Sequence, residues 1–248
     1  MRILELDAGN SRLKWRVSDT DGIVSHGYLA NSDDWHQELP LLMGQIGQID
    51  CARASIVSGN ERFELLNAEI DRHFNIPLLQ AEVKSEWRGV RVAYPGLGVD
   101  RWLAMLAANH QDQRADKLVV SCGTAITLDV LSNDGEHSGG YIVPGVGLMK
   151  RMLHANTAQL PMVETAASDV MPGKNSIDCI NNGILAMVAA MVNTQQAIHK
   201  TSHKASYKDR VVYLTGGDGA LLKPYIHGEC FYYPELVMNG LALAFEDA

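Results

Sequence analysis

Hydrophobic and polar positions form the same pattern twice along the chain. Near the start, the strand-like run 2–6 leads into Asp7-Ala8-Gly9-Asn10-Ser11; near the middle, 117–120 leads into Ser121-Cys122-Gly123-Thr124-Ala125. A second apolar run follows each glycine, at 13–17 and 126–131, and is followed by an Asp-Gly dipeptide, a strong hairpin signal. Each pattern therefore predicts a strand, a glycine turn, a second strand, a tight turn and a third strand.

The two patterns are separated by a nearly constant spacing. Asp7 and Ser121, which precede the glycine turns, lie 114 residues apart, and the Asp-Gly dipeptides at Asp21 and Asp134 lie 113 residues apart. Either copy alone is explained equally well as an ordinary hairpin. The repetition predicts two related halves, which we place at residues 1–113 and 114–248.

The rest of the chain predicts alternating helices and strands. In the first half we expect helices at 39–46, 61–73 and 100–110, strands at 54–58 and 76–79, and a turn-rich loop at 90–98. In the second half we expect helices at 147–154, at 177–198 and after Pro234, a buried strand at 211–214, and a linker-like stretch at 201–209. This order indicates the α/β class.

Composition and charge narrow the function. The 248 residues are 46% hydrophobic and 20% charged, with a net charge of −8 and no dense Lys/Arg run, which argues against nucleic acid as a partner. The four cysteines are scattered and form no Cys/His cluster, so neither a zinc site nor a disulfide framework is expected. We expect neither an apolar leader nor an apolar run long enough to span a bilayer, which predicts a cytoplasmic protein with no membrane partner.

The glycine turns are candidate anion sites. Glycine has no Cβ, so backbone N–H groups beside it can approach a phosphate, and two such turns facing each other across a cleft would hold one polyphosphate. Asp100, which opens a helix pattern, is either a helix cap or a functional carboxylate; the adjacent Arg-Trp pair is harder to explain by capping. Gly216 and Gly217 follow a strand and could contact a nucleoside or simply form a turn.

Taken together, the motifs resemble the ordered signature of type III pantothenate kinases, in the superfamily of actin and the acetate and sugar kinases. The matching motifs are Asp7-x-Gly9-Asn10-Ser11, Gly98-Val99-Asp100-Arg101-Trp102, Gly123-Thr124-Ala125-x-Thr127-x-Asp129, Gly139-Gly140-x-Ile142-x-Pro144-Gly145 and Thr215-Gly216-Gly217. Each motif is moderately specific, and the complete order is highly specific. The resemblance covers nearly the whole chain.

The resemblance implies a duplicated actin-like (ribonuclease H-like) fold whose two halves flank a nucleotide cleft. It implies a homodimer that phosphorylates pantothenate with ATP and Mg²⁺ or another divalent cation, the first step of coenzyme A synthesis. The implied ATP-binding residues are Asp7, Ala8, Gly9, Asn10, Ser11, Arg12, Leu13, Lys14, Gly123 and Thr124, with Asp7 acting through magnesium. The implied pantothenate-binding residues are Tyr94, Gly98, Val99, Asp100, Arg101 and Ser176, the last from a turn that the partner subunit could supply.

The chemistry expected of these residues is phosphoryl transfer. Asp100 stands at the family's base position and would accept the substrate hydroxyl proton. Arg101 beside it would hold either the developing phosphate charge or the substrate carboxylate. Backbone N–H groups at Gly9 and Gly123, together with Mg²⁺, would neutralise the phosphate oxygens.

Two positions depart from the family pattern. Ser11 replaces a common Thr and keeps the hydroxyl. Ser121 replaces an Asp that belongs to a site for a monovalent cation such as K⁺ or NH₄⁺, so we expect weak dependence on such ions. Two alternatives stay open: another small-molecule kinase of the superfamily, and a non-catalytic regulator of the same family.

Overall fold

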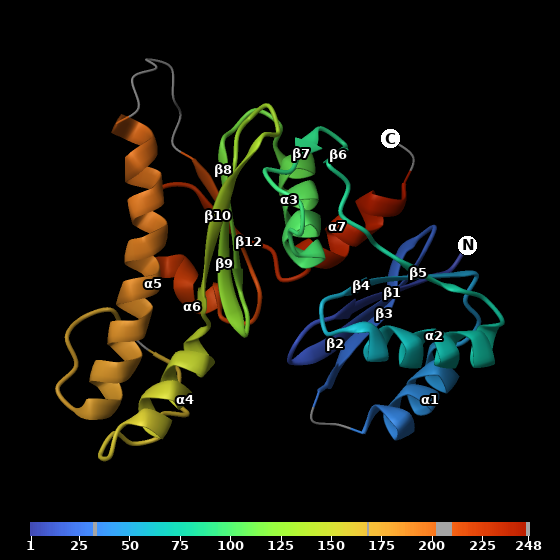
Figure 1. The fold of residues 1–248 in the computed structure, drawn as a ribbon, viewed down its shortest axis with the longest axis horizontal. Coiled ribbons are helices and arrows are strands. Elements are labelled where there is room, and N and C mark those ends of the chain that lie inside the picture. Colours follow the sequence, from blue (N-terminus) through green and yellow to red (C-terminus); the bar gives the residue numbers. More distant parts are fainter. Residues whose placement is uncertain (32–33, 168, 202–209, 247–248) are drawn as a thin grey trace. The chain divides into compact units, whose positions relative to one another are not determined.

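The computed structural model describes residues 1–31, 34–167, 169–201 and 210–246. Its strands form two five-stranded sheets with the same topology, β3-β2-β1-β4-β5 and β10-β9-β8-β11-β12 (Figure 1). In each sheet the central strand, β1 or β8, pairs antiparallel with the strand that follows it in the chain and parallel with β4 or β11. That parallel neighbour pairs in turn, also in parallel, with the edge strand β5 or β12. The duplicated actin-like α/β fold expected from the sequence is confirmed. The linker predicted at 201–209 falls almost wholly outside the described residues.

The first sheet follows the predicted hairpins closely. Its strands are β1 (Ile3–Ala8), β2 (Arg12–Asp19), β3 (Gly22–Ala30), β4 (Cys51–Ile56) and β5 (Leu78–Gln80), with helices α1 (Trp35–Ile46) and α2 (Asn60–Phe74). Gly22 takes φ 123° in the Asp-Gly turn, which glycine adopts without strain. Helices α1 and α2 cover one face of the sheet (Figure 1). Their apolar residues, among them Leu39 and Leu66, belong to one core with residues of the strands.

The second sheet is built in the same order. Its strands are β8 (Lys117–Cys122), β9 (Ala125–Leu131), β10 (His137–Pro144), β11 (Val211–Thr215) and β12 (Cys230–Tyr232). Its helices are α4 (Val146–Asn156), α5 (Ser176–Thr201), the short α6 (Gly219–Leu222) and a 3-10 turn, η1 (Lys223–Tyr225). Asn175 caps α5: its side-chain oxygen accepts from the Asp178 N–H at 3.0 Å and its amide donates to the Asp178 carboxylate at 2.7 Å.

The chain divides into two compact units that are not simple halves of the sequence. One contains residues 1–87, 96–107 and 237–248, and the other residues 88–95 and 108–236. Helix α3 (Val99–Gln111) contributes to both, and α7 (Leu236–Phe245) belongs almost wholly to the first. In the first unit α7 approaches α3 so closely that a Cβ on Gly240 would lie 1.9 Å from the Leu103 carbonyl oxygen.

Short strands were the elements that the sequence did not predict. Strand β6 (Glu86–Trp87), just before the turn-rich loop, and strand β7 (Val90–Arg91), at its start, form a two-stranded sheet, and β12 has only three residues. Such strands are too short to show a period of two, so only tertiary pairing reveals them.

Helix α5 corrects one expectation. Its residues Ser176–Ala197 are long and apolar enough, with a hydropathy of 1.2, to cross a membrane by length and composition alone. The prediction that no run reaches this length was therefore wrong. Helix α5 lies beside the second sheet (Figure 1). Its residues Ile184, Val188 and Val192 belong to the core of that sheet, as those of a core helix in a globular protein do.

Candidate functional site

The two glycine turns are closed by their own backbone hydrogen bonds. The Gly9 N–H donates to the Arg12 carbonyl at 3.0 Å, and the Gly123 N–H donates to the Ala125 carbonyl at 3.0 Å. This corrects the role expected for these two N–H groups, because each is already used to form its turn. The tips of the turns, Asn10, Ser11 and Thr124, are exposed and present the surface that an anion could approach.

The same bonds explain the change in spacing between the two halves. The first turn closes over two residues, Asn10 and Ser11, whereas the second closes over one, Thr124. Positions before the turns are therefore 114 residues apart and positions after them 113. The side chains of Ala8 and Leu13, which flank the first turn, lie in the core, so only their backbones could face a nucleotide.

Asn31 supports the first turn, and sequence reasoning missed it. Its backbone N–H donates to the Ser11 carbonyl at 2.9 Å, and its side-chain amide donates to the Gly9 carbonyl at 3.1 Å. Arg62 donates to the Asn31 side-chain oxygen at 3.4 Å and lies over the Trp35 ring, 3.8 Å from its centroid. No motif spacing connects Asn31 with Gly9, because only the pairing of β2 with β3 brings them together.

Two more glycines crowd against the second turn. A Cβ on Gly145, where α4 begins, would lie 2.0 Å from the Gly123 carbonyl oxygen, and one on Gly216 would lie 2.3 Å from the Cys122 carbonyl oxygen. Gly216 has φ 83°, and the Tyr232 hydroxyl donates to its carbonyl at 3.1 Å. Gly145 and Gly216 thus share one steric cause, which is close backbone packing around the 122–124 turn.

A buried lysine lies beside this cluster. The Lys150 ammonium donates to the Thr165 carbonyl at 2.7 Å, and burial lowers its pKa while the nearby Asp218 opposes that shift. Lys150 was not among the predicted site residues.

In each sheet, strand register places side chains from three neighbouring strands in two rows on one face. Each row of the first sheet has a counterpart at the corresponding positions of the second sheet. The row nearest the glycine turn, here the turn row, consists of Lys14, Asp7 and Ser55 in the first sheet and Thr127, Ser121 and Thr215 in the second. Two residues further from the turn, the inner row consists of Arg16, Glu5 and Arg53 in the first sheet and Asp129, Val119 and Tyr213 in the second. Directly paired residues share a face of the sheet, so each row is a line of neighbouring side chains.

The first turn row has the donors that a divalent cation bound to ATP requires. Asp7 supplies one carboxylate, and Ser55 beside it is fully buried with a hydroxyl that has no hydrogen-bond partner. The Ser58 hydroxyl, just beyond the end of β4, is also buried without a partner. Mg²⁺ needs only one or two carboxylates because phosphates and water complete its shell. Among the described residues no cluster of three or more His, Cys, Asp or Glu side chains could hold a metal by itself.

Asp100 lies in the first turn of α3. The Trp102 N–H donates to the Gly98 carbonyl at 3.1 Å, and a Cβ on Gly98 would lie 2.8 Å from an Asp100 carboxylate oxygen. Glycine at position 98 therefore leaves room for the carboxylate. Asp100 and Val99 are half-buried and Arg101 is buried.

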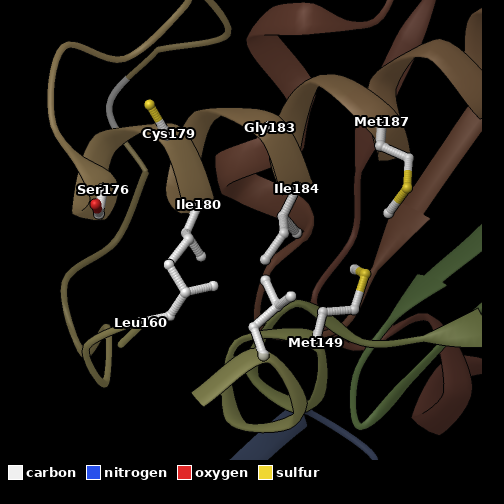
Figure 2. Close-up of a pocket in the computed structure, with 9 residues that line it drawn as sticks. Met149, Leu160, Ser176, Cys179, Ile180, Gly183, Ile184 and Met187 are labelled. Carbon is white, nitrogen blue, oxygen red and sulfur yellow. The ribbon is translucent and has the colours of Figure 1, made fainter. Parts of the chain in front are cut away.

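The other predicted substrate residues, Tyr94 and Ser176, belong to the second unit. Tyr94 is exposed, with its ring centroid 6.0 Å from that of His137. Ser176 begins α5 and lines a groove of about 660 Å³ between α4 and α5. Figure 2 shows its hydroxyl at one end of a row of apolar side chains that includes Ile180, Ile184 and Met149.

Comparison with known proteins identifies the family. The profile of the type III pantothenate kinase family matches residues 3–198. The type III pantothenate kinase of Pseudomonas paraeruginosa strain PA7 is 37% identical over 250 residues, which cover 98% of each chain.

Solved structures share the fold. A putative Baf family transcriptional activator from Campylobacter jejuni has a TM-score of 0.62 at 20% identity, covering 97% of this chain and 96% of that one. The activator of 2-hydroxyisocaproyl-CoA dehydratase from Clostridium difficile, solved with bound ADPNP, has a TM-score of 0.52 at 12% identity, covering 99% and 94%. The family profile and the full-length sequence match show that the chain belongs to the type III pantothenate kinase family of phosphotransferases.

Proposed function

We propose that the catalytic machinery of this kinase is divided between the first turn row and the start of α3. Asp7 holds the divalent cation that accompanies ATP, and Lys14 lies beside it in the row to neutralise phosphate charge. Bound Mg²⁺ would supply electrostatic stabilisation of the transferring phosphoryl group. Asp100 accepts the proton of the pantothenate hydroxyl, and Arg101 holds negative charge next to it.

The observation that carries this proposal is the position of Asp100. A helix cap would suffice to explain an acid in the first turn of α3. Capping alone does not explain Gly98, whose missing Cβ leaves space at the Asp100 carboxylate. Nor does it explain why both residues occur in Gly98-Val99-Asp100-Arg101-Trp102, one of the motifs that resemble the family signature.

The test is ADP release from ATP, measured with pantothenate and with a panel of sugars and acetate. We expect stimulation by pantothenate alone. Asp100→Asn keeps most of the cap geometry and removes the base, so kcat should fall by about 10²- to 10⁴-fold. Asp178→Asn, in the first turn of α5, is the matched control and should keep kcat within about twofold. Near-normal kcat in a folded Asp100→Asn variant would make the residue a cap.

Monovalent cations have a reduced role in this proposal. The second turn row offers hydroxyls at Thr127, Ser121 and Thr215 but no carboxylate, so a bound K⁺ or NH₄⁺ would lack a charge partner there. A cytoplasmic location is part of the same proposal, and the four cysteines, all free, are consistent with a reducing compartment.

We further propose a homodimer that covers the groove between α4 and α5. The groove is lined by Ile180, Ile184 and other apolar side chains, and Met187 and Leu153 on its walls are 54% and 36% exposed. Exposed apolar patches of this kind mark association surfaces. Covering it would place Ser176 at the subunit interface, as the resemblance implies.

Analytical ultracentrifugation can test the dimer. Met187→Glu puts a charge on the groove wall and should shift the protein toward monomer, with a raised KM for pantothenate. Leu41→Glu, on an exposed α1 position with 60% exposure, is the matched control and should not change the sedimentation coefficient. A dimer unaffected by Met187→Glu would rule out this surface.

A further inference from the structure

The segment Arg88–Pro95, which carries Tyr94, is fastened to the turn between β9 and β10. A Cβ on Gly135 would lie 1.6 Å from the Gly89 carbonyl oxygen, so the two backbones touch at that point. The Arg91 N–H donates to the Gly135 carbonyl at 2.9 Å, and the Arg91 guanidinium pairs with the Glu136 carboxylate. This ion pair is exposed and therefore contributes little.

A buried pair makes the second connection. His137 Nε2 lies 2.9 Å from Asp129 Oδ1, and both side chains are fully buried. The other ring nitrogen, Nδ1, lies 3.3 Å from the backbone nitrogen of Ala93, the residue before Tyr94. One histidine thus links a carboxylate in the inner row of the second sheet to the backbone of the Tyr94 segment.

The donors fix the histidine tautomer. The Ala93 N–H can only donate, so Nδ1 must accept and cannot carry a proton. The proton of the neutral ring is then on Nε2, where it donates to Asp129. A buried carboxylate favours this arrangement because it can only accept. The charge of Asp129 therefore keeps Nδ1 available to hold Ala93.

We propose that Asp129 and His137 are positioning residues for pantothenate binding, acting through the Tyr94 segment. The Tyr94 and His137 rings lie against each other with centroids 6.0 Å apart, so the histidine supports both the backbone before Tyr94 and its side chain. The inference rests on the proposed function, in which Tyr94 contacts pantothenate. Neither Asp129 nor His137 touches the reacting atoms.

The test uses two variants that preserve size. His137→Gln retains an N–H donor near the Nε2 position but has no acceptor at the Nδ1 position. It should raise KM for pantothenate by roughly 3- to 10-fold, the equivalent of one hydrogen bond, while KM for ATP stays unchanged. Asp129→Asn allows either histidine tautomer and should shift KM in the same direction by a smaller factor. Glu136→Gln, which removes only the exposed ion pair, is the matched control and should leave both KM values unchanged.

Hydrogen exchange provides a readout that does not depend on activity. Faster exchange of the Ala93 amide in His137→Gln, with core amides unchanged, is expected. Three results would overturn the positioning role. They are a parallel rise in the KM values for pantothenate and ATP, an unchanged KM for pantothenate, and an Ala93 amide that exchanges as fast as in the wild type. Failure of the proposed function would appear separately, as wild-type protein whose ADP release does not respond to pantothenate. If His137→Gln does not fold, Asp129→Asn decides the question by the same two measurements.

Discussion

The two sheets share one topology but differ in the charge of their corresponding rows. The inner row of the first sheet is Arg16, Glu5 and Arg53, whereas the second has Asp129, Val119 and Tyr213. In the turn rows, the first sheet has the charged pair Lys14 and Asp7 where the second has only hydroxyls. The duplicated fold thus preserved backbone positions and changed the side chains that occupy them.

In both inner rows a buried charged side chain attaches a distant segment of the chain to the sheet, but the residues differ. In the first sheet Glu5 accepts from Arg16 at 2.5 Å and from Arg53 at 2.7 Å, and Arg16 also donates to the Met238 carbonyl at 2.9 Å and to the Asn239 side chain at 2.8 Å. Arg16, a buried charge of the inner row, therefore attaches α7 to the first sheet. The corresponding position in the second sheet, Asp129, fastens the Tyr94 segment through its histidine.

The largest expected effect comes from breaking the charged inner row. Glu5→Gln leaves two buried guanidinium groups without their carboxylate and should cost about 3–5 kcal/mol of unfolding free energy. Urea denaturation followed by circular dichroism measures this. Glu136→Gln, which breaks an exposed pair, should cost less than about 1 kcal/mol. Equal losses in the two variants would mean that the inner row is not a buried network in solution.

The next effect tests the asymmetry of the turn rows. Asp7→Asn removes the only carboxylate of the first row and should lower kcat by about 10²- to 10³-fold, with weaker binding of Mg²⁺-ATP in a fluorescence titration. Ser121→Ala, at the corresponding position of the second row, should change kcat by no more than a few-fold. If the two substitutions had equal effects, the two turns would contribute equally to metal and phosphate binding.

The smallest effect is expected from a substitution that makes the second turn row more like the first. Ser121→Asp adds a carboxylate and should introduce or strengthen activation by K⁺, which we expect to be only a few-fold in the wild type. Initial rates are compared across K⁺ concentrations at constant ionic strength, so that screening does not imitate binding. A wild-type enzyme inactive without K⁺ would show that other oxygen ligands hold the ion and that Ser121 is a neutral replacement.

The sequence predicted the repeated elements well because each has a local signal. Alternating apolar residues, a glycine break and an Asp-Gly turn specify each hairpin without reference to the rest of the chain. Helix α5, which was expected at 177–198, was also predicted close to its observed bounds. Motif order also pointed to Asp7, Asp100 and the family that the comparisons confirm.

The rest depends on pairing between distant positions. Asn31 reaches Gly9 only through strand register, and His137 reaches Ala93 only after the chain has folded. The use of the Gly9 and Gly123 N–H groups inside their own turns could not be predicted either, because a glycine motif does not reveal which partner its backbone chooses. Sequence reasoning predicted where the two turns lie and missed Asn31, which supports the first of them.

The attachment of α7 to the inner row of the first sheet has a consequence for protein synthesis. A ribosome makes β1, β2 and β4 early, yet the partners of Arg16 on α7 emerge only after nearly every other element. Until α7 has been made, Arg16 lacks its partners at Met238 and Asn239. Because α7 follows the second sheet in the chain, we expect the first sheet to complete its hydrogen bonds only after the second sheet has been synthesised.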